Sequence, residues 1–186
     1  MNKTVYFAVY LMVLGMVVTF VAYVGYNFTI EYIEANKIER INQSIALLYS
    51  PEDGYKRNPN QTENKYREEE EKHISAIYEV LDSNDTLVAV IYDVNADGRN
   101  AAVYALIAVD PYTDEIVGVT YYDHQETPNL GERYTRDEEI DKLIGQKISN
   151  VEIDAITGAT TTWGAIDLMF SEVSDHYQKR EVHIDG

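Results

Sequence analysis

The feature that most constrains this chain of 186 residues is an uncharged apolar segment near its start. Residues 5–26 contain no Asp, Glu, Lys or Arg. As a helix rising ~1.5 Å per residue they would extend about 33 Å, which is enough to cross the hydrocarbon core of a bilayer. A cleaved signal peptide usually has a shorter apolar region, and no convincing Ala-x-Ala site follows this one. The segment therefore predicts a retained membrane anchor within residues 1–28.

Composition excludes several classes of partner and site. The formal net charge is −17, which argues against nucleic acid and against docking on an anionic lipid surface, because both need clustered Lys and Arg. Contact with membrane lipid is expected through the anchor alone. The chain has no Cys, so disulfides, iron–sulfur clusters and Cys-type zinc sites are excluded.

Residues 29–85 are predicted to form a helical connector with a polar loop. Apolar residues fall on one helical stripe as far as residue 49. Residues 50–64 are polar and contain Pro51, Gly54 and Pro59, which predicts a loop. An acidic run at residues 68–71 resembles the first turn of a second amphipathic helix. The stripe of that helix would be Ile74, Ile77, Tyr78 and Leu81.

A change to β-forming residues marks the start of a domain predicted over residues 86–186. Residues 87–92, 102–109 and 115–122 are rich in Val, Ile and Tyr, and turn sequences separate them. The pattern predicts an antiparallel meander. Residues 93–98 match the start of a calcium-binding loop, but Tyr104 stands where the bidentate Glu is required, so no metal site is predicted.

Two helices and a further β-like stretch are predicted after the meander. Residues 135–138 read as a capping box that starts a short helix. Ile148, Val151 and Ile153 have the pattern of a strand. A C-terminal helix is predicted from about residue 161 to residue 179, because apolar residues recur at helical spacing from Trp163 onward.

Between that strand and that helix, residues 154–160 read Asp-Ala-Ile-Thr-Gly-Ala-Thr. Gly158 and Ala159 let the backbone turn tightly. The first backbone N–H groups of a helix lack intrahelical partners and favour an anion. A hydroxyl from Thr160 at this position would lie beside a natural phosphate site, although Thr is also a common helix N-cap.

Residues 154–160 resemble the flavinylation motif Asp-x-x-(Ser/Thr)-Gly-Ala-Thr of the FMN-binding domain family. Residues 124–131 resemble the same family's loop His-x-Glu-Thr-Pro-Gly-Leu-Gly, with Asn129 in place of the usual Gly. The resemblance is clearest from residue 86 to residue 170. It implies an α+β fold, in which an N-terminal transmembrane helix precedes one soluble FMN-binding domain with an antiparallel sheet and packed helices.

The resemblance also implies a covalent FMN, joined to Thr160 through its phosphate by a separate flavin transferase. Asp154 is expected to act in recognition or attachment, and residues 126–131 are expected to contact the isoalloxazine ring. No catalytic residue is predicted in the chain. The implied FMN-binding residues are Asp154, Thr157, Gly158, Ala159, Thr160, Thr161, Thr162, Glu126, Thr127, Leu130 and Gly131.

Two groups of the family combine these motifs with an N-terminal membrane anchor. They are the G subunits of Rnf-type ion-translocating ferredoxin:NAD oxidoreductase complexes and the C subunits of sodium-translocating NADH:quinone oxidoreductases. The resemblance implies a redox subunit in the cell membrane, without complete catalytic activity alone and with other membrane subunits as partners. The compact length favours the Rnf type.

The orientation of the chain in the membrane is less clear from the sequence, and two alternative functions stay open. The basic residues that flank the anchor are close to a tie, so the resemblance alone places the N-terminus in the cytoplasm and the soluble domain on the extracytoplasmic face. A free-standing anchored flavoprotein for extracytoplasmic electron transfer stays open. So does an anchored binding domain without flavin.

Overall fold

The computed structural model describes the backbone of residues 3–58 and 72–184. The chain divides near residue 42 into two compact units. The acidic run at residues 68–71 lies outside the described residues, so the helical turn expected there stays a prediction.

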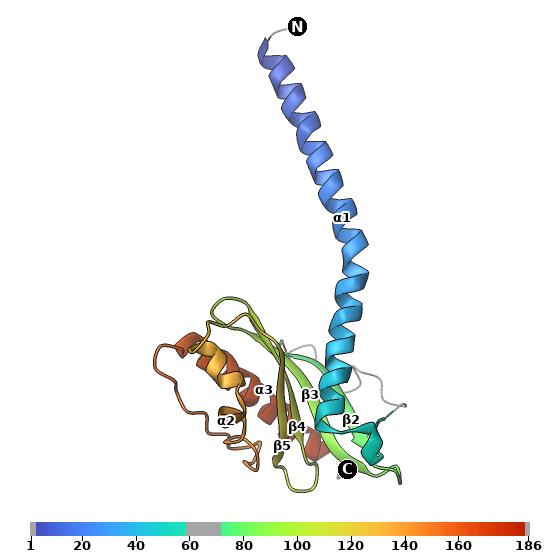
Figure 1. Cartoon of the computed structure of the whole chain (residues 1–186), viewed down its shortest axis with the longest axis vertical. Helices are drawn as coiled ribbons and strands as arrows, with labels where there is room; N and C mark the ends of the chain where they lie inside the picture. Colours follow the sequence, from blue (N-terminus) through green and yellow to red (C-terminus); the bar gives the residue numbers. More distant parts are fainter. Residues whose placement is uncertain (1–2, 59–71, 185–186) are drawn as a thin grey trace. The chain divides into compact units, whose positions relative to one another are not determined.

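Helix α1 (Lys3–Leu48) is one continuous helix (Figure 1), as the stripe beyond the apolar segment predicted. It is long and apolar enough to cross a membrane. Two of its threonine hydroxyls bond to its own backbone: Thr19 Oγ1 donates to Gly15 O at 2.9 Å, and Thr29 Oγ1 donates to Gly25 O at 3.1 Å. Such internal satisfaction of side-chain donors suits a hydrocarbon environment, which offers no water as an alternative partner.

The second unit is built on an antiparallel sheet of five described strands that follow the order of the chain (Figure 1). The register pairs Tyr92 with Ile107 and Leu106 with Thr120. The sheet confirms the predicted meander and the antiparallel α+β class. Its strands are β1 (Lys56–Arg57), β2 (Ile74–Leu81), β3 (Leu87–Asp97), β4 (Ala102–Val109) and β5 (Ile116–Asp123).

The core of this unit lies between one face of the sheet and helix α3 (Thr160–Ile184). Alternate residues of β3 and β4 point into it, because side chains alternate between the two faces of a strand. The helix contributes residues three and four apart, as an amphipathic helix does. Central members are Val90, Tyr92, Val94, Ala105, Ile107, Ile166, Met169, Phe170 and Val173.

The helix predicted over residues 74–81 is wrong, because these residues form strand β2. Ala76 and Val80 are buried along with Ile74, Ile77 and Tyr78. Both faces of the strand are therefore largely covered, and its apolar residues do not alternate strictly. A short apolar run of this kind cannot be distinguished from a helix by spacing alone. The described part of residues 29–85 thus contributes two strands to the sheet as well as the end of α1.

Two smaller local predictions are also corrected. Helix α2 (Asp137–Ile140) begins without a side-chain cap, because Thr135 Oγ1 donates to Glu132 O instead of capping the helix. Thr135 itself ends a 3₁₀ helix, η2 (Gly131–Thr135). Residues 151–156 have no regular secondary structure and do not form the predicted strand. A 3₁₀ turn, η1 (Pro51–Asp53), occupies part of the predicted loop.

Candidate functional site

The turn and the helix start predicted at residues 154–160 are both present. Gly158 has φ +88°, a left-handed conformation that Gly adopts without steric cost. Ala159 N donates to Ile156 O at 3.0 Å, and Trp163 N donates to Ala159 O at 2.9 Å. Ala159 is therefore the N-cap of α3. Thr160 is its first residue and is exposed.

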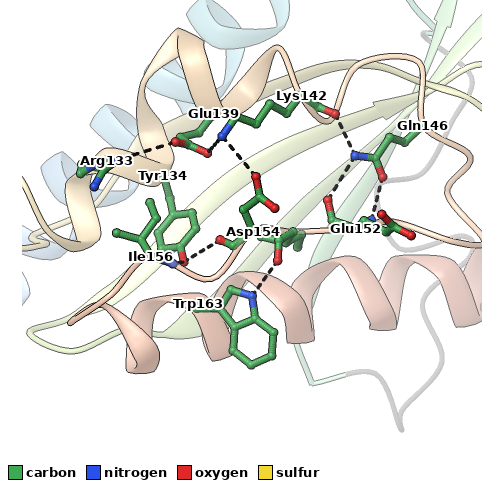
Figure 2. A network of polar contacts seen from close by, with 10 residues as sticks. Arg133, Tyr134, Glu139, Lys142, Gln146, Glu152, Asp154, Ile156 and Trp163 are labelled. Carbon is green, nitrogen blue, oxygen red and sulfur yellow. Dashed lines mark hydrogen bonds and ion pairs between the residues drawn. The ribbon is translucent and has the colours of Figure 1, made fainter.

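The irregular segment before this turn is held by side chains instead of by a neighbouring strand (Figure 2). Gln146 Nε2 donates to Glu152 O at 3.1 Å, and Gln146 Oε1 accepts from Glu152 N at 2.7 Å. The indole of Trp163 donates to Ile153 O at 3.0 Å. Backbone N–H and C=O groups need partners, and these contacts supply them where residues 152–156 follow an irregular path to the motif.

Tyr134 makes the two hydrogen bonds nearest the turn (Figure 2). Its hydroxyl donates to Asp154 O at 3.1 Å and accepts from Ile156 N at 2.8 Å. Tyr134 is 3% exposed and Ile156 is 9% exposed, so the hydrogen bond from Ile156 N lies away from water. The sequence gives no signal for this role, because Tyr134 lies in neither motif.

We expect Tyr134→Phe to destabilise the fold by about 1–3 kcal/mol, the cost of leaving a buried backbone donor without a partner. Urea unfolding would measure the loss, and amide exchange should accelerate at Ile156. Tyr112→Phe is the control because Tyr112 is 72% exposed. Equal unfolding midpoints for the two variants would contradict the prediction.

The loop at residues 124–131 leaves β5 and leads into η2. Asn129 has φ +61°, a conformation that Asn tolerates better than most residues, so Asn here fits where the family motif has Gly. Glu132 Oε2 accepts from Asn129 N at 3.0 Å and from Arg136 Nη2 at 2.9 Å. The pKa of the Glu132 carboxyl is lowered mainly by the hydrogen bond from Asn129 N and, to a smaller extent, by the hydrogen bond from Arg136. These contacts fix the loop in its turned form.

The two motifs meet at the start of α3. A side chain added at Gly158 would place its Cβ 3.2 Å from Leu130 Cδ2. Thr162 Oγ1 donates to Glu126 Oε2 at 2.6 Å. The fold thus brings the loop residues Glu126, Leu130 and Gly131 to Gly158 and Thr162, which lie far from them in sequence.

Asp154 lies apart from this meeting point. Its side chain is 78% exposed and pairs with Lys142, whose Nζ donates to Asp154 Oδ2 at 3.3 Å and to Glu139 Oε2 at 2.7 Å (Figure 2). The bond to Glu139, with a further contribution from Asp154, raises the pKa of Lys142. Asp154 also lines a cavity of about 270 Å³ whose lining includes no residue of 157–162 or 126–131.

The start of α3 fits a phosphate group. Thr157, Thr160 and Thr161 are exposed, whereas Ala159 and Thr162 are buried. The amides of the first turn have no intrahelical acceptor, and the positive end of the helix dipole favours an anion there. A hydroxyl, free amides and a glycine turn are therefore combined at one exposed point, while Leu130, itself 36% exposed, lies beside it.

Residues 98–174 match the family model of the FMN-binding domain. This match agrees with the resemblance found in the two motifs, both of which lie within the matched residues, and it supports FMN as the cofactor. The matched span begins at the turn between β3 and β4 and ends within α3.

Curated relatives include the C subunit of the Na(+)-translocating NADH-quinone reductase from two organisms. The protein from Pasteurella multocida (strain Pm70) is 28% identical over 116 residues, which are 53% of this chain and 45% of the relative. The protein from Vibrio alginolyticus is 24% identical over 115 residues, or 52% of this chain and 45% of the relative. The match thus spans less than half the length of these relatives. The crystal structure of Shewanella oneidensis NqrC is similar with a TM-score of 0.48 and 21% identity, covering 57% of this chain and 60% of the other.

Proposed function

We propose that this protein is a membrane-anchored electron-transfer subunit that carries FMN covalently at Thr160, with its soluble domain on the extracytoplasmic face. The observation that carries the proposal is the exposed Thr160 hydroxyl at the first turn of α3, within a domain of the FMN-binding family. The membrane assignment is supported by α1, which is long enough to span a bilayer. The proposal therefore rests on the Thr160 hydroxyl, the match to the FMN-binding domain and helix α1 together.

Attachment requires an activated flavin, because a hydroxyl and a phosphate do not condense unaided in water. We propose a flavin dinucleotide as the donor, delivered by a flavin transferase. The Thr160 oxygen forms a bond to the phosphorus of the FMN half, the pyrophosphate bond breaks, and AMP leaves. The hydroxyl proton passes to a base on the transferase. The net gain of the protein is FMN minus one water.

The residues around Thr160 would then hold the phosphate. The free amides of the first turn and the hydroxyls of Thr157 and Thr161 are donors of the kind that phosphate oxygens accept. Gly158 lets the backbone approach the group closely. Thr127, Leu130 and Gly131 are proposed to border the isoalloxazine ring, with Leu130 offering its exposed apolar side chain. Bound FMN supplies one- and two-electron redox chemistry, and the protein contributes position and electrostatics.

Asp154 is proposed to act during attachment rather than in holding phosphate, because a carboxylate beside a phosphate is unfavourable. Its exposure and its weak surface pairing with Lys142 leave it accessible to the transferase. We expect Asp154→Ala to reduce the yield of flavinylated protein by about tenfold or more, the size of a lost hydrogen bond to a charged group. Intact mass after co-production with a transferase would measure it. Glu152→Ala, an exposed acid outside the motif, should be modified normally, and a normal yield from Asp154→Ala would refute this role.

The protein is proposed to work with other membrane subunits in an ion-translocating oxidoreductase complex, of the Rnf ferredoxin:NAD type. The relatives from Pasteurella multocida and Vibrio alginolyticus make the NADH:quinone type the specific alternative. Membranes from the native host would distinguish them. Loss of ferredoxin:NAD activity on deleting the chain supports the first, and loss of NADH:quinone activity with ferredoxin:NAD activity intact supports the second.

The central test is the mass of the protein purified from its native host. Retention of flavin after denaturation, together with a mass gain of FMN minus one water, is the expected result. An unmodified mass, under conditions in which a known flavinylated protein is modified, would overturn the proposed function.

A further inference from the structure

Glu126 is a buried carboxylate, 6% exposed, that joins three separate segments of the fold. Its Oε1 accepts from the backbone N–H of Arg99, at the turn between β3 and β4, with a nitrogen-to-oxygen distance of 2.9 Å. Its Oε2 accepts from Thr162 Oγ1, in the first turn of α3, at 2.6 Å. Glu126 itself belongs to the loop that follows β5. One side chain thus links a hairpin turn, a loop and a helix start.

Two glycines leave the space that this carboxylate occupies. A Cβ added at Gly98 would lie 2.2 Å from Glu126 Oε1. A Cβ added at Gly131 would lie 2.2 Å from Glu126 Oε2 and 2.5 Å from Thr162 Oγ1. Neither glycine has a positive φ, so close approach is what requires Gly at both positions: the Glu126 side chain in each case and, at Gly98, also the backbone oxygen of Ala101, 2.9 Å from the added Cβ. The carboxylate lies in a site shaped around it.

The contact between Glu126 and Thr162 distinguishes Thr162 from the two threonines that precede it in α3. The hydroxyl proton of Thr162 is donated to Glu126, and Thr162 is 2% exposed. Thr160 and Thr161 are exposed to solvent. On an α-helix the side chains of consecutive residues point in directions about 100° apart, so fixing the rotation of α3 through Thr162 also fixes the direction of Thr160.

We propose that Glu126 is a positioning residue: by binding the Thr162 hydroxyl and the Arg99 amide, it locks the start of α3 against the loop and makes Thr160 the hydroxyl presented for flavin attachment. This inference rests on the proposed function. It replaces the expected role of Glu126 as a contact to the isoalloxazine ring, because both oxygens are used within the protein. Glu126 then sets the acceptor site without touching the flavin.

The test compares Glu126→Ala with the conservative Glu126→Gln in the full chain. The amide oxygen of Gln can accept from Arg99, and its N–H can donate to the Thr162 oxygen, so Gln keeps the link while Ala removes it. In Glu126→Ala we expect about tenfold slower attachment of FMN at Thr160, the factor that corresponds to a lost hydrogen bond to a charged group. Peptide mass mapping should also find part of the flavin on Thr161 or Thr162. Glu126→Gln and the control Glu138→Ala, at an exposed position of α2, should be modified at Thr160 at the wild-type rate.

A second readout needs no flavin. Trp163 is the single Trp of the chain and follows Thr162 directly. In unmodified protein, Glu126→Ala should accelerate amide exchange at both Arg99 and Trp163 and shift the emission of Trp163, whereas Glu126→Gln should change neither. Thr162→Val, which removes only the donor, should affect Trp163 and spare Arg99. It also tests the link if Glu126→Ala fails to fold.

The outcomes separate this inference from the proposed function. Wild-type exchange at both amides in Glu126→Ala, or unchanged rate and site of attachment despite faster exchange, would overturn the positioning role. A wild-type protein that never acquires FMN would overturn the proposed function alone, and exchange at Arg99 and Trp163 would still decide whether Glu126 locks the helix start.

Discussion

Replacing Thr160 by Ala is expected to abolish covalent flavin. The variant removes the proposed acceptor oxygen, so the mass gain of FMN minus one water should vanish. The fold should tolerate the change, because Thr160 is exposed and Ala159, not Thr160, caps the helix. Ala is also the residue that most favours a helix interior. Intact mass and flavin fluorescence after denaturation would measure the effect.

Two matched variants make the Thr160 result specific. Ser171→Ala removes an exposed hydroxyl further along α3, outside the proposed FMN site, and should keep full attachment. Thr160→Ser keeps a hydroxyl and should keep attachment at a reduced or equal rate. Flavin still bound covalently to Thr160→Ala, at any site, would contradict the acceptor assignment, and a site outside residues 157–162 would also contradict the interpretation of the motif.

Replacing Met169 by Ala is expected to cause the largest loss of stability, about 2–5 kcal/mol. Met169 is fully buried at the centre of the contact between α3 and the sheet. Truncation removes apolar contacts and leaves a cavity that the surrounding strands cannot fill. Urea unfolding of the full chain in detergent, followed through Trp163 fluorescence, would give the difference.

Leu168 provides the control for Met169, because it is the preceding residue of the same helix but is 45% exposed. Leu168→Ala should change the free energy of unfolding by no more than about 0.5 kcal/mol. Similar losses for the two variants would mean that α3 does not pack through the Met169 face. The start of α3, and with it Thr160, depends on this packing.

Local patterns in the sequence were sufficient for much of the fold. The uncharged stretch predicted a helix able to cross a membrane, and α1 contains it. The β-rich runs predicted β3, β4 and β5 in their antiparallel order. The turn at Gly158 and the helix after it followed from a small-residue pair and helical spacing. Each of these depends on a few neighbouring residues, so local chemistry decides it.

Strand β2 shows where local patterns were not sufficient. Ile74, Ile77, Tyr78 and Leu81 have helical spacing, yet they form a strand between β1 and β3. Burial of both faces hides the alternation that would mark a strand. The strand expected at residues 148–153 does not form for a different reason: side chains of Tyr134, Gln146 and Trp163, not a neighbouring strand, bond to the backbone there and just beyond it.

The sequence by itself determined the long apolar helix, the meander and the two motifs, because each depends on contiguous residues. The tertiary structure alone decided how those motifs meet. Glu126 and Thr162 are 36 positions apart in the chain, yet they share a 2.6 Å hydrogen bond. Asp154, six positions before Thr160, instead faces Lys142. Contacts between distant segments depend on how the sheet and α3 pack, and side-chain packing of that kind leaves no periodic signal in the sequence.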